Sequence, residues 1–400
     1  MPGGPGSYII GEEERAEVLD VLDRGSLFRY GKEDDPRYLH KCVDFERLLE
    51  KTLNVKHALA TTSGTASLMA ALAALEIGQG DEVIVPGYTF IATMSAVRLC
   101  GAIPVLAEID ESLTIDPEKL DALVTPRTSA VIPVHMLGNP CEMDAVMAFA
   151  KRHNLYVLED ACQACGASYR GRRVGTIGDI GAFSLNVFKT ITSGDGGAVV
   201  TNDDALYERA FGFHDQGHKP NRTGVEVGNR SIIGMNMRMN ELTGAVALAQ
   251  TRKLDKILAA LREKKARFKA ALEGLPGVSF RRINDPGECA TLLTLLFETP
   301  AYAEAFCGIF GGAPVARSGW HVYNNMEQIL AIDPKRYRKH MLPATDAILG
   351  RAVNLSVGVV DTGLGAGKGI NILSTDEEID RVAENVRNDV LRAYEKGAKG

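Results

Sequence analysis

The sequence predicts an α/β fold, with a mixed, mainly parallel sheet in a large domain and a smaller α+β domain after it. Three observations predict it. From residue 57 to about 203, short β-branched runs alternate with segments whose apolar residues recur at helical spacing. Several of these runs are almost continuously apolar, as expected of strands that helices cover on both faces. Beyond a long helical pattern that ends near residue 273, the segments become shorter and less regular.

The expected strands of the large domain are short runs rich in β-branched residues. They cover residues 82–86, 103–107, 129–134, 155–158, 182–185 and 197–201. Helices are expected between strands at residues 63–77, 116–124 and 142–153. In the second of these, Pro117 at the first helical position and Glu118 near the positive end of the dipole favour a helix start after Asp116.

Residues 240–273 are expected to form one long helix or two nearly collinear ones, apolar in the first half and charged on one face in the second. Such a helix commonly leaves one domain and enters another. We therefore divide the chain into a large domain, residues 1–255, and a small one, residues 256–400. A closing amphipathic helix is expected over residues 375–395, and the glycine-rich stretch 363–369 is expected to be a mobile surface loop.

The composition argues against several classes of protein. Forty-five Lys and Arg against 51 Asp and Glu give a formal net charge of −6, without the basic face that nucleic-acid binding requires. Seven scattered cysteines fit a reducing compartment better than a secreted disulfide framework. The chain has no apolar run of about 18 residues, the length that a membrane helix needs. We expect a cytoplasmic protein with neither nucleic acid nor membrane as partner.

The sharpest candidate for chemistry is Lys189. Its neighbours Val187, Phe188 and Ile191 are apolar and would strip water from the amine, which favours the neutral, nucleophilic form. The alternative is a lysine whose stem lies along an apolar surface while its charge stays in solvent.

A second candidate is the acid that follows an expected buried strand. The run 155–158 leads directly into Glu159 and Asp160. Ligands of open α/β sheets gather at the carboxyl ends of strands, so Asp160 is placed to pair with a protonated ring nitrogen of a cofactor. The alternative is that one of the two carboxylates caps the next helix.

Two further candidates lie earlier in the chain. Small residues from Thr61 to Ser67 open the helix expected at 63–77, and hydroxyls and N–H groups at a helix start can bind phosphate. Ser63 as an ordinary N-cap explains the same residues. Phe90 could stack on a ring or simply pack in the core.

Other residues have the spacing of known motifs without the rest of the pattern. Cys162 and Cys165 are not followed by a second pair at zinc-site spacing, so we interpret them as packing residues. His214 and His218 lack the pattern of a zinc protease, and no metal site is expected.

Taken together, Ser63, Phe90, Asp160 and the spacing of Ser184 and Lys189 resemble the DegT/DnrJ/EryC/StrS family of aminotransferases. These enzymes use pyridoxal 5′-phosphate (PLP) and act on keto sugars. The resemblance covers about residues 8–390. It implies the aspartate aminotransferase-like fold, type I of the PLP-dependent enzymes, and PLP as the cofactor.

The resemblance also assigns roles to single residues. Lys189 corresponds to the Schiff-base lysine and Asp160 to the acid at the pyridine nitrogen, and it implies that both are catalytic. The further cofactor contacts that it implies are Gly64, Thr65 and Ser184 at the phosphate, Phe90 on the ring and Gln163 near the ring 3-hydroxyl. Asn236 corresponds to an asparagine that the neighbouring subunit supplies to the phosphate, which implies a homodimer with shared active sites.

Lysine rather than histidine at position 189 separates this chain from family members that dehydrate sugars. The expected reaction is therefore amino transfer from glutamate or glutamine to an aldehyde or keto sugar. Within the family, the segments 28–30, 215–218, 322–325 and 350–352 are similar to those of members that aminate the C8 carbonyl of an oxidised octulosonate. Candidate sugar contacts are Trp320, His321, Tyr323 and Arg351, although Trp320 could equally be core.

Two alternatives remain open on the residues alone. The acceptor could be a nucleotide-linked keto sugar or a keto-cyclitol. The chain could also be a catalytically silent binding or regulatory protein, although the presence of Lys189 and Asp160 speaks against that.

Overall fold

The structure is a computed structural model that describes residues 3–32, 34–220, 228 and 230–397. Its centre is a seven-stranded sheet in the order β1-β9-β8-β5-β4-β2-β3. The strands are β1 (His57–Thr61), β2 (Glu82–Pro86), β3 (Ile103–Ala107), β4 (Thr128–Val131), β5 (Tyr156–Asp160), β8 (Ile180–Ser184) and β9 (Gly197–Thr201). Only β9 runs antiparallel to its neighbours in this sheet, β1 and β8; the other pairs are parallel. The predicted mixed, mainly parallel sheet is confirmed.

Three predicted strands match β2, β3 and β9 residue for residue, and the other three differ from β4, β5 and β8 at their ends. The helix expected at 116–124 is wrong. The chain forms two 3₁₀ turns there, Pro117–Lys119 and Asp121–Leu123. Pro126 follows closely and disfavours helical backbone at the residue before it, so the segment is too short for a full helix.

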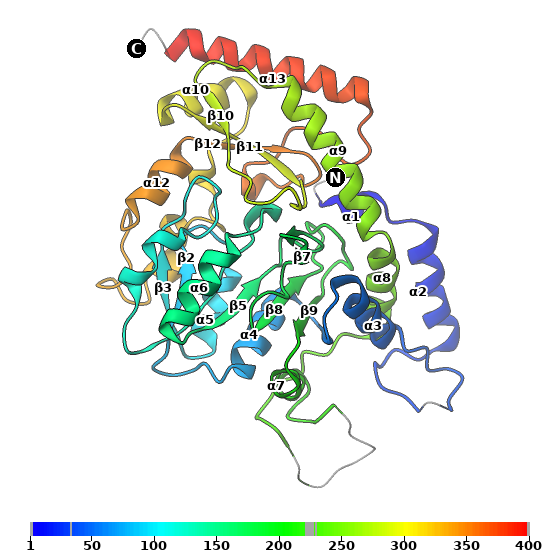
Figure 1. Cartoon of the computed structure of the whole chain (residues 1–400). Helices are drawn as coiled ribbons and strands as arrows, with labels where there is room; N and C mark the ends of the chain where they lie inside the picture. Colours follow the sequence, from blue (N-terminus) through cyan, green and yellow to red (C-terminus); the bar gives the residue numbers. More distant parts are fainter. Residues whose placement is uncertain (1–2, 33, 221–227, 229, 398–400) are drawn as a thin grey trace.

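The helices of the first 214 residues are α1 (Pro5–Tyr8), α2 (Glu12–Arg24), α3 (Lys41–Leu53), α4 (Gly64–Ala74), α5 (Ala92–Leu99), α6 (Met143–His153) and α7 (Asp204–His214). Of these, α3 to α7 pack on the sheet, whereas α2 packs on α8 (Glu241–Arg252), a later helix (Figure 1). A two-residue hairpin, β6 (Ser168–Tyr169) with β7 (Arg172–Arg173), lies outside the main sheet. None of the residues of α4 is fully exposed, and most are buried, because the helix packs against β8 and β9 on one side and α5 and α7 on others.

Side chains of each strand alternate between two separate apolar cores, one on each face of the sheet. In β5, Val157 belongs to the core that contains Phe149 and Phe183, whereas Leu158 belongs to the core that contains Leu68 and Val85. The next two residues of β5 are therefore directed to opposite faces as well.

The predicted long helical segment is two helices, α8 (Glu241–Arg252) and α9 (Leu254–Ala271), which follow one another with Lys253 between them. A three-stranded antiparallel sheet follows, made of β10 (Val278–Phe280), β11 (Leu292–Phe297) and β12 (Ala352–Ser356). The remaining helices are α10 (Pro300–Phe310), α11 (Glu327–Leu330), α12 (Pro343–Gly350) and α13 (Asp376–Gly397). Figure 1 shows α10, α13 and the small sheet at one end of the molecule. The domain boundary at residue 255 stays a prediction.

The glycine-rich stretch 363–369 is not the surface loop that we expected. Leu364 and Ala366 are buried, and Gly369 pairs with Ser356 beside the small sheet. The Asn354 side chain donates a hydrogen bond to the Leu364 carbonyl at 2.8 Å. Apolar side chains between the glycines bury the stretch, a tertiary effect that its glycine content does not reveal.

Among the residues that the structure describes, none of the helices has both the length and the apolarity needed to cross a membrane.

Candidate active site

A cavity of about 600 Å³ lies at the carboxyl end of β5, between the first turn of α4 and segments from the C-terminal part of the chain. It brings together most of the residues that the sequence singled out. These are Gly64, Thr65, Phe90, Asp160, Gln163, Ser184, Lys189, Trp320 and His321. They come from segments up to 257 residues apart, so folding gathers a set that the sequence predicted piece by piece.

Asp160 is the last residue of β5 and is 4% exposed. Its carboxylate accepts a hydrogen bond from the Thr93 hydroxyl at 2.7 Å and one from the Cys162 N–H at 3.1 Å. The second bond closes a turn and is not the helix cap that we considered as an alternative, because β6 and not a helix follows β5. One side chain thus holds a turn and lines the cavity. A buried carboxylate with two hydrogen bonds keeps lone pairs for a cationic partner.

The first turn of α4 has the features of an anion site. The Ser63 hydroxyl accepts the N–H of Ala66 at 3.1 Å, which confirms Ser63 as the N-cap. The N–H groups of Gly64 and Thr65 precede the first intrahelical hydrogen bond and so are available to an anion. A Cβ on Gly64 would lie 2.7 Å from the Cβ of Ser184, so only glycine lets the turn approach that strand.

Lys189 and Phe90 form another wall of the cavity. Lys189 is half-buried, and its Nζ lies 6.0 Å from the centre of the Phe90 ring. The Phe90 ring is 40% exposed and faces the cavity rather than a core. An exposed aromatic face beside an amine can stack on a planar ring.

Trp320 and His321 reach the cavity because their segment pairs with the chain after β2. The N–H groups of Thr89 and Ile91 donate to the carbonyls of His321 and Trp320, each at 2.9 Å. Trp320 is 57% exposed, which removes the alternative that it is a core residue. Burial and the nearby Lys189 charge lower the pKa of His321 to about 3, so its imidazole is neutral at pH 7.

Three predicted site residues do not line this cavity. Tyr323 is buried, and its hydroxyl lies 3.3 Å from a carboxylate oxygen of Asp346. Arg351 forms an ion pair with Glu111 at 2.5 Å, away from the cavity. We therefore leave Tyr323 and Arg351 out of the site. Asn236 is exposed and accepts the N–H of Arg238 at 3.3 Å, so its contact with a phosphate stays a prediction.

Four further residues contribute to this site without having been predicted from the sequence. Thr93 donates to Asp160, while Leu137, Thr291 and Asp361 line the cavity. The spacing of Phe90 and Thr93, three residues apart and so one helical turn, could have indicated Thr93. The other three lie in segments whose position depends on long-range packing.

The thiol groups of Cys162 and Cys165, near Asp160, are poorly suited to take part in this chemistry. Both are free, and burial raises the pKa of the Cys165 thiol to about 12 and that of Cys162 well above its ordinary value. Thiols that stay protonated are poor nucleophiles and poor metal ligands. Within the described ranges, the structure has no group of three or more His, Cys, Asp or Glu side chains that could hold a metal.

The lining residues fit PLP. The N-terminus of α4 with Ser184 suits its phosphate, Asp160 suits a protonated pyridine nitrogen, Phe90 suits the ring face and Lys189 suits the aldehyde. The glycine at position 64, which a Cβ could not replace, leaves the backbone open to the phosphate.

Comparison with known proteins agrees with this fit. The sequence profile of the DegT/DnrJ/EryC1/StrS aminotransferase family matches residues 8–361. A GDP-perosamine synthase of Caulobacter vibrioides is 43% identical over 248 residues, which are 62% of this chain and 64% of that protein. An L-glutamine:2-deoxy-scyllo-inosose aminotransferase of Micromonospora echinospora is 39% identical over 243 residues, 58% of this chain and 57% of that protein. These alignments therefore span less than two thirds of either relative.

A solved structure is similar over almost the whole chain. The crystal structure of 3-amino-5-hydroxybenzoic acid synthase has a TM-score of 0.81 at 29% sequence identity, covering 98% of this chain and 99% of that one.

Proposed function

The chain belongs to the DegT/DnrJ/EryC1/StrS aminotransferase family, a family of PLP-dependent enzymes, and we propose that it transfers an amino group from glutamate or glutamine to an aldehyde or keto sugar. One observation carries the proposal. Lys189 and Asp160 line the same cavity, together with a helix start suited to phosphate. This set has the parts that amino transfer requires, so we favour an enzyme over a silent binding protein.

PLP, when bound, supplies an electron sink for the pair left behind as a proton departs from the substrate. Lys189 would hold the cofactor and, once displaced by the amino donor, act as the base that takes the proton from the donor Cα and later returns it. Asp160 would keep the ring nitrogen protonated, while the Thr93 hydroxyl and the Cys162 N–H hold that carboxylate in place. His321, neutral at pH 7, adds no positive charge to the site.

For the acceptor, we propose an aldehyde sugar acid, an octulosonate oxidised at C8, aminated to 8-amino-3,8-dideoxy-octulosonate. Among the described residues that line the cavity, Lys189 is the one Lys or Arg, whereas Asp160, Asp195 and Asp361 are acidic. The diphosphate of a nucleotide-linked sugar carries about two negative charges and is usually bound by several basic side chains, which this wall lacks, whereas the sugar acid carries a single carboxylate. The names of the two relatives favour a nucleotide-linked keto sugar or a keto-cyclitol as the second candidate.

We also propose a homodimer in which each chain completes the site of the other. Phe28 and Met235 are each 53% exposed, and Ile233 is 93% exposed. The guanidinium of Arg238 lies 5.5 Å from the Phe28 ring, so the segments around residues 28 and 236 share one face. A second copy would cover this apolar face and bring Asn236 to the phosphate of its neighbour.

Covalent trapping tests the cofactor assignment. Wild-type protein reduced with borohydride should retain one labelled PLP per chain on the peptide that contains Lys189, and Lys189→Ala should retain none. Lys56→Ala is the matched control, because Lys56 is an exposed lysine paired with Asp204. A covalent adduct on another lysine of Lys189→Ala would refute the assignment.

Release of the 2-oxo acid from glutamate or glutamine tests the acceptor. The panel holds free aldehyde sugars, an octulosonate aldehyde, keto-cyclitols and nucleotide-linked keto sugars. We expect the highest kcat/KM with the octulosonate aldehyde, and a clear preference for a nucleotide-linked sugar would overturn that choice.

Mixing tests the shared site. Lys189→Ala and Asn236→Asp are each expected to be inactive. If the subunits share sites, hybrids assembled from the two should regain activity, because one of their two sites has both residues intact. A monomer in solution, or no recovery in proven hybrids, would contradict the proposal.

A further inference from the structure

The 3₁₀ turn Met136–Gly138 holds an uncommon backbone conformation beside the cavity. Leu137 has φ 56° and ψ 31°, in the left-handed region that side chains disfavour. Gly138 follows with φ 77°, and a Cβ there would lie 2.7 Å from the Cβ of Cys289. Such a turn persists only where its surroundings hold it in place.

The turn fixes the amide of Gln163. The Leu137 N–H donates a hydrogen bond to Oε1 of Gln163 at 3.0 Å, and both residues line the cavity. Because the amide oxygen is engaged in this bond, the NH₂ group is the part of the amide left to face a ligand. Gln163 is therefore set as a hydrogen-bond donor toward the cavity.

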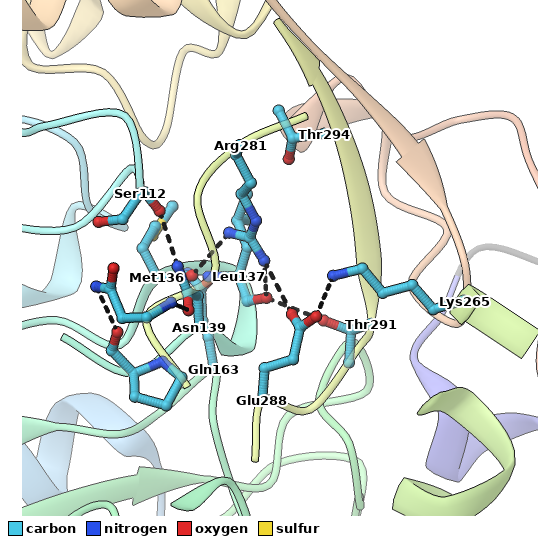
Figure 2. A network of polar contacts seen from close by, with 12 residues as sticks. Ser112, Met136, Leu137, Asn139, Gln163, Lys265, Arg281, Glu288, Thr291 and Thr294 are labelled. Carbon is cyan, nitrogen blue, oxygen red and sulfur yellow. Dashed lines mark hydrogen bonds and ion pairs between the residues drawn. The ribbon is translucent and has the colours of Figure 1, made fainter. Parts of the chain in front are cut away.

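Arg281 holds the turn from the C-terminal part of the chain. Its side chain is 1% exposed, and its guanidinium donates to the carbonyls of Met136 at 3.2 Å and Leu137 at 3.0 Å. The Thr291 hydroxyl also reaches the Leu137 carbonyl, at 3.4 Å. Figure 2 shows the guanidinium between this turn and Glu288.

Glu288 and Lys265 anchor Arg281 on its other side. Arg281 Nη2 lies 3.5 Å from one oxygen of Glu288, and Lys265 Nζ donates to the other at 2.5 Å. Figure 2 shows this chain of charges running away from the turn. The three side chains carry a net charge of +1 in a buried place, and burial lowers the pKa of Lys265 to about 8.

We infer that Arg281 is a positioning residue for the cofactor: by clamping the Met136–Gly138 turn, it fixes the Gln163 amide with its NH₂ toward the ring 3-oxygen. The inference rests on the proposed function and on the family resemblance, which implies that Gln163 lies near that oxygen. A fixed donor stabilises the deprotonated 3-oxygen and so lowers the pKa of the cofactor bound at Lys189. Without the clamp, the amide can turn its oxygen to the cavity and this stabilisation is lost.

The absorbance of the bound cofactor tests the inference, because it reports the protonation of the cofactor without turnover. In Arg281→Met holoenzyme, the spectral pKa should rise by about one pH unit, the effect of losing one hydrogen bond to a charged oxygen. Gln163→Leu should raise it by a similar amount. The double variant should match Gln163→Leu alone, because Arg281 acts through Gln163.

Two variants separate this role from a general loss of stability. Arg387 is a matched control, because its guanidinium also donates to two carbonyls, those of Ala271 and Glu273, each at 3.0 Å, and neither of these residues belongs to the clamp. Arg387→Met should leave the spectral pKa unchanged. Arg281→Lys keeps a charge opposite Glu288 and should shift the spectral pKa less than Arg281→Met. Arg281→Met leaves Lys265 and Glu288 as a neutral buried pair, which favours a folded variant.

The outcomes are distinguishable from failure of the proposed function. A shift in Gln163→Leu without one in Arg281→Met overturns the inference and leaves the enzyme assignment intact. An unchanged spectral pKa in Gln163→Leu also overturns the inference, because it would show that Gln163 does not contact the ring 3-oxygen. Only trapping at Lys189 decides the proposed function itself.

Discussion

Glu159 and Asp160 are adjacent carboxylates at the end of β5, and they lie in different surroundings on opposite faces of the sheet. Glu159 is fully buried and accepts N–H groups of Gly175, Ile177 and Gly178 at 2.8, 2.5 and 2.6 Å. It also lies 2.9 Å from Nε2 of the buried His135. Asp160 has two donors and faces the cavity.

The number of donors around each acid separates a structural from a functional carboxylate in this fold. The four donors around Glu159 fill most of its hydrogen-bonding capacity, so it holds the loop 175–178 against the sheet. Asp160 is as buried but less satisfied, and its remaining capacity points into a space large enough for a cofactor. The pleat of one strand is enough to give neighbouring acids these two roles.

The largest effect should come from Asp160→Asn. The amide cannot balance a protonated ring nitrogen, so kcat should fall by about 10³-fold, while the free energy of unfolding of the apoprotein changes little. Steady-state kinetics and urea unfolding check both parts. Near-normal turnover would show that the comparison assigns the wrong acid to catalysis.

Glu159→Gln is the same chemical change one residue away, and it should act on stability instead. Its NH₂ group would meet N–H donors, and His135 would lose its buried acid, so the free energy of unfolding should fall by about 3 kcal/mol. Activity of the protein that remains folded should change far less than in Asp160→Asn. A stable but inactive Glu159→Gln would reverse the two roles.

Thr93→Val should sharpen the comparison by removing one of the two donors to Asp160 while keeping the side-chain shape. We expect kcat to fall by about tenfold, the equivalent of one hydrogen bond to a charged group. Thr89→Val is the control, because the Thr89 hydroxyl contacts that of Thr93 at 2.7 Å and is one step further from the acid. Equal losses in both variants would contradict a direct role for Thr93.

The smallest effect should be a pH dependence of stability caused by His321, which lines the cavity. The pKa of His321 is about 3 in the folded chain, below its ordinary value of 6.5, so between these values the unfolded chain binds more protons. Stability should therefore fall as the pH drops below 6.5, by about 1 kcal/mol at pH 5.5 from this residue. His321→Asn should remove that part of the loss in urea unfolding. Identical pH profiles would show that His321 does not titrate this way.

Much of the fold could be predicted because it depends on short-range patterns. The strands β2, β3 and β9 follow from β-branched runs, and the start of α4 follows from Ser63 as N-cap. The two failures differ in origin. The segment before Pro126 forms 3₁₀ turns instead of the helix that periodicity predicted, which is a local effect. The glycine-rich stretch is ordered by burial of its apolar residues, which is a tertiary effect.

The chemical groups of the candidate site could be named from the amino-acid sequence: an amine at 189, an acid at the end of a strand and a glycine at a helix start. The end of a strand and the start of a helix depend on residues close by in the chain, so a sequence pattern can predict them. Only the tertiary structure decided that Trp320 and His321 join them, that Tyr323 and Arg351 do not, and that Arg281 clamps a turn 144 residues away. Those outcomes depend on how distant elements pack and in which register they pair, and no local pattern of residues encodes either.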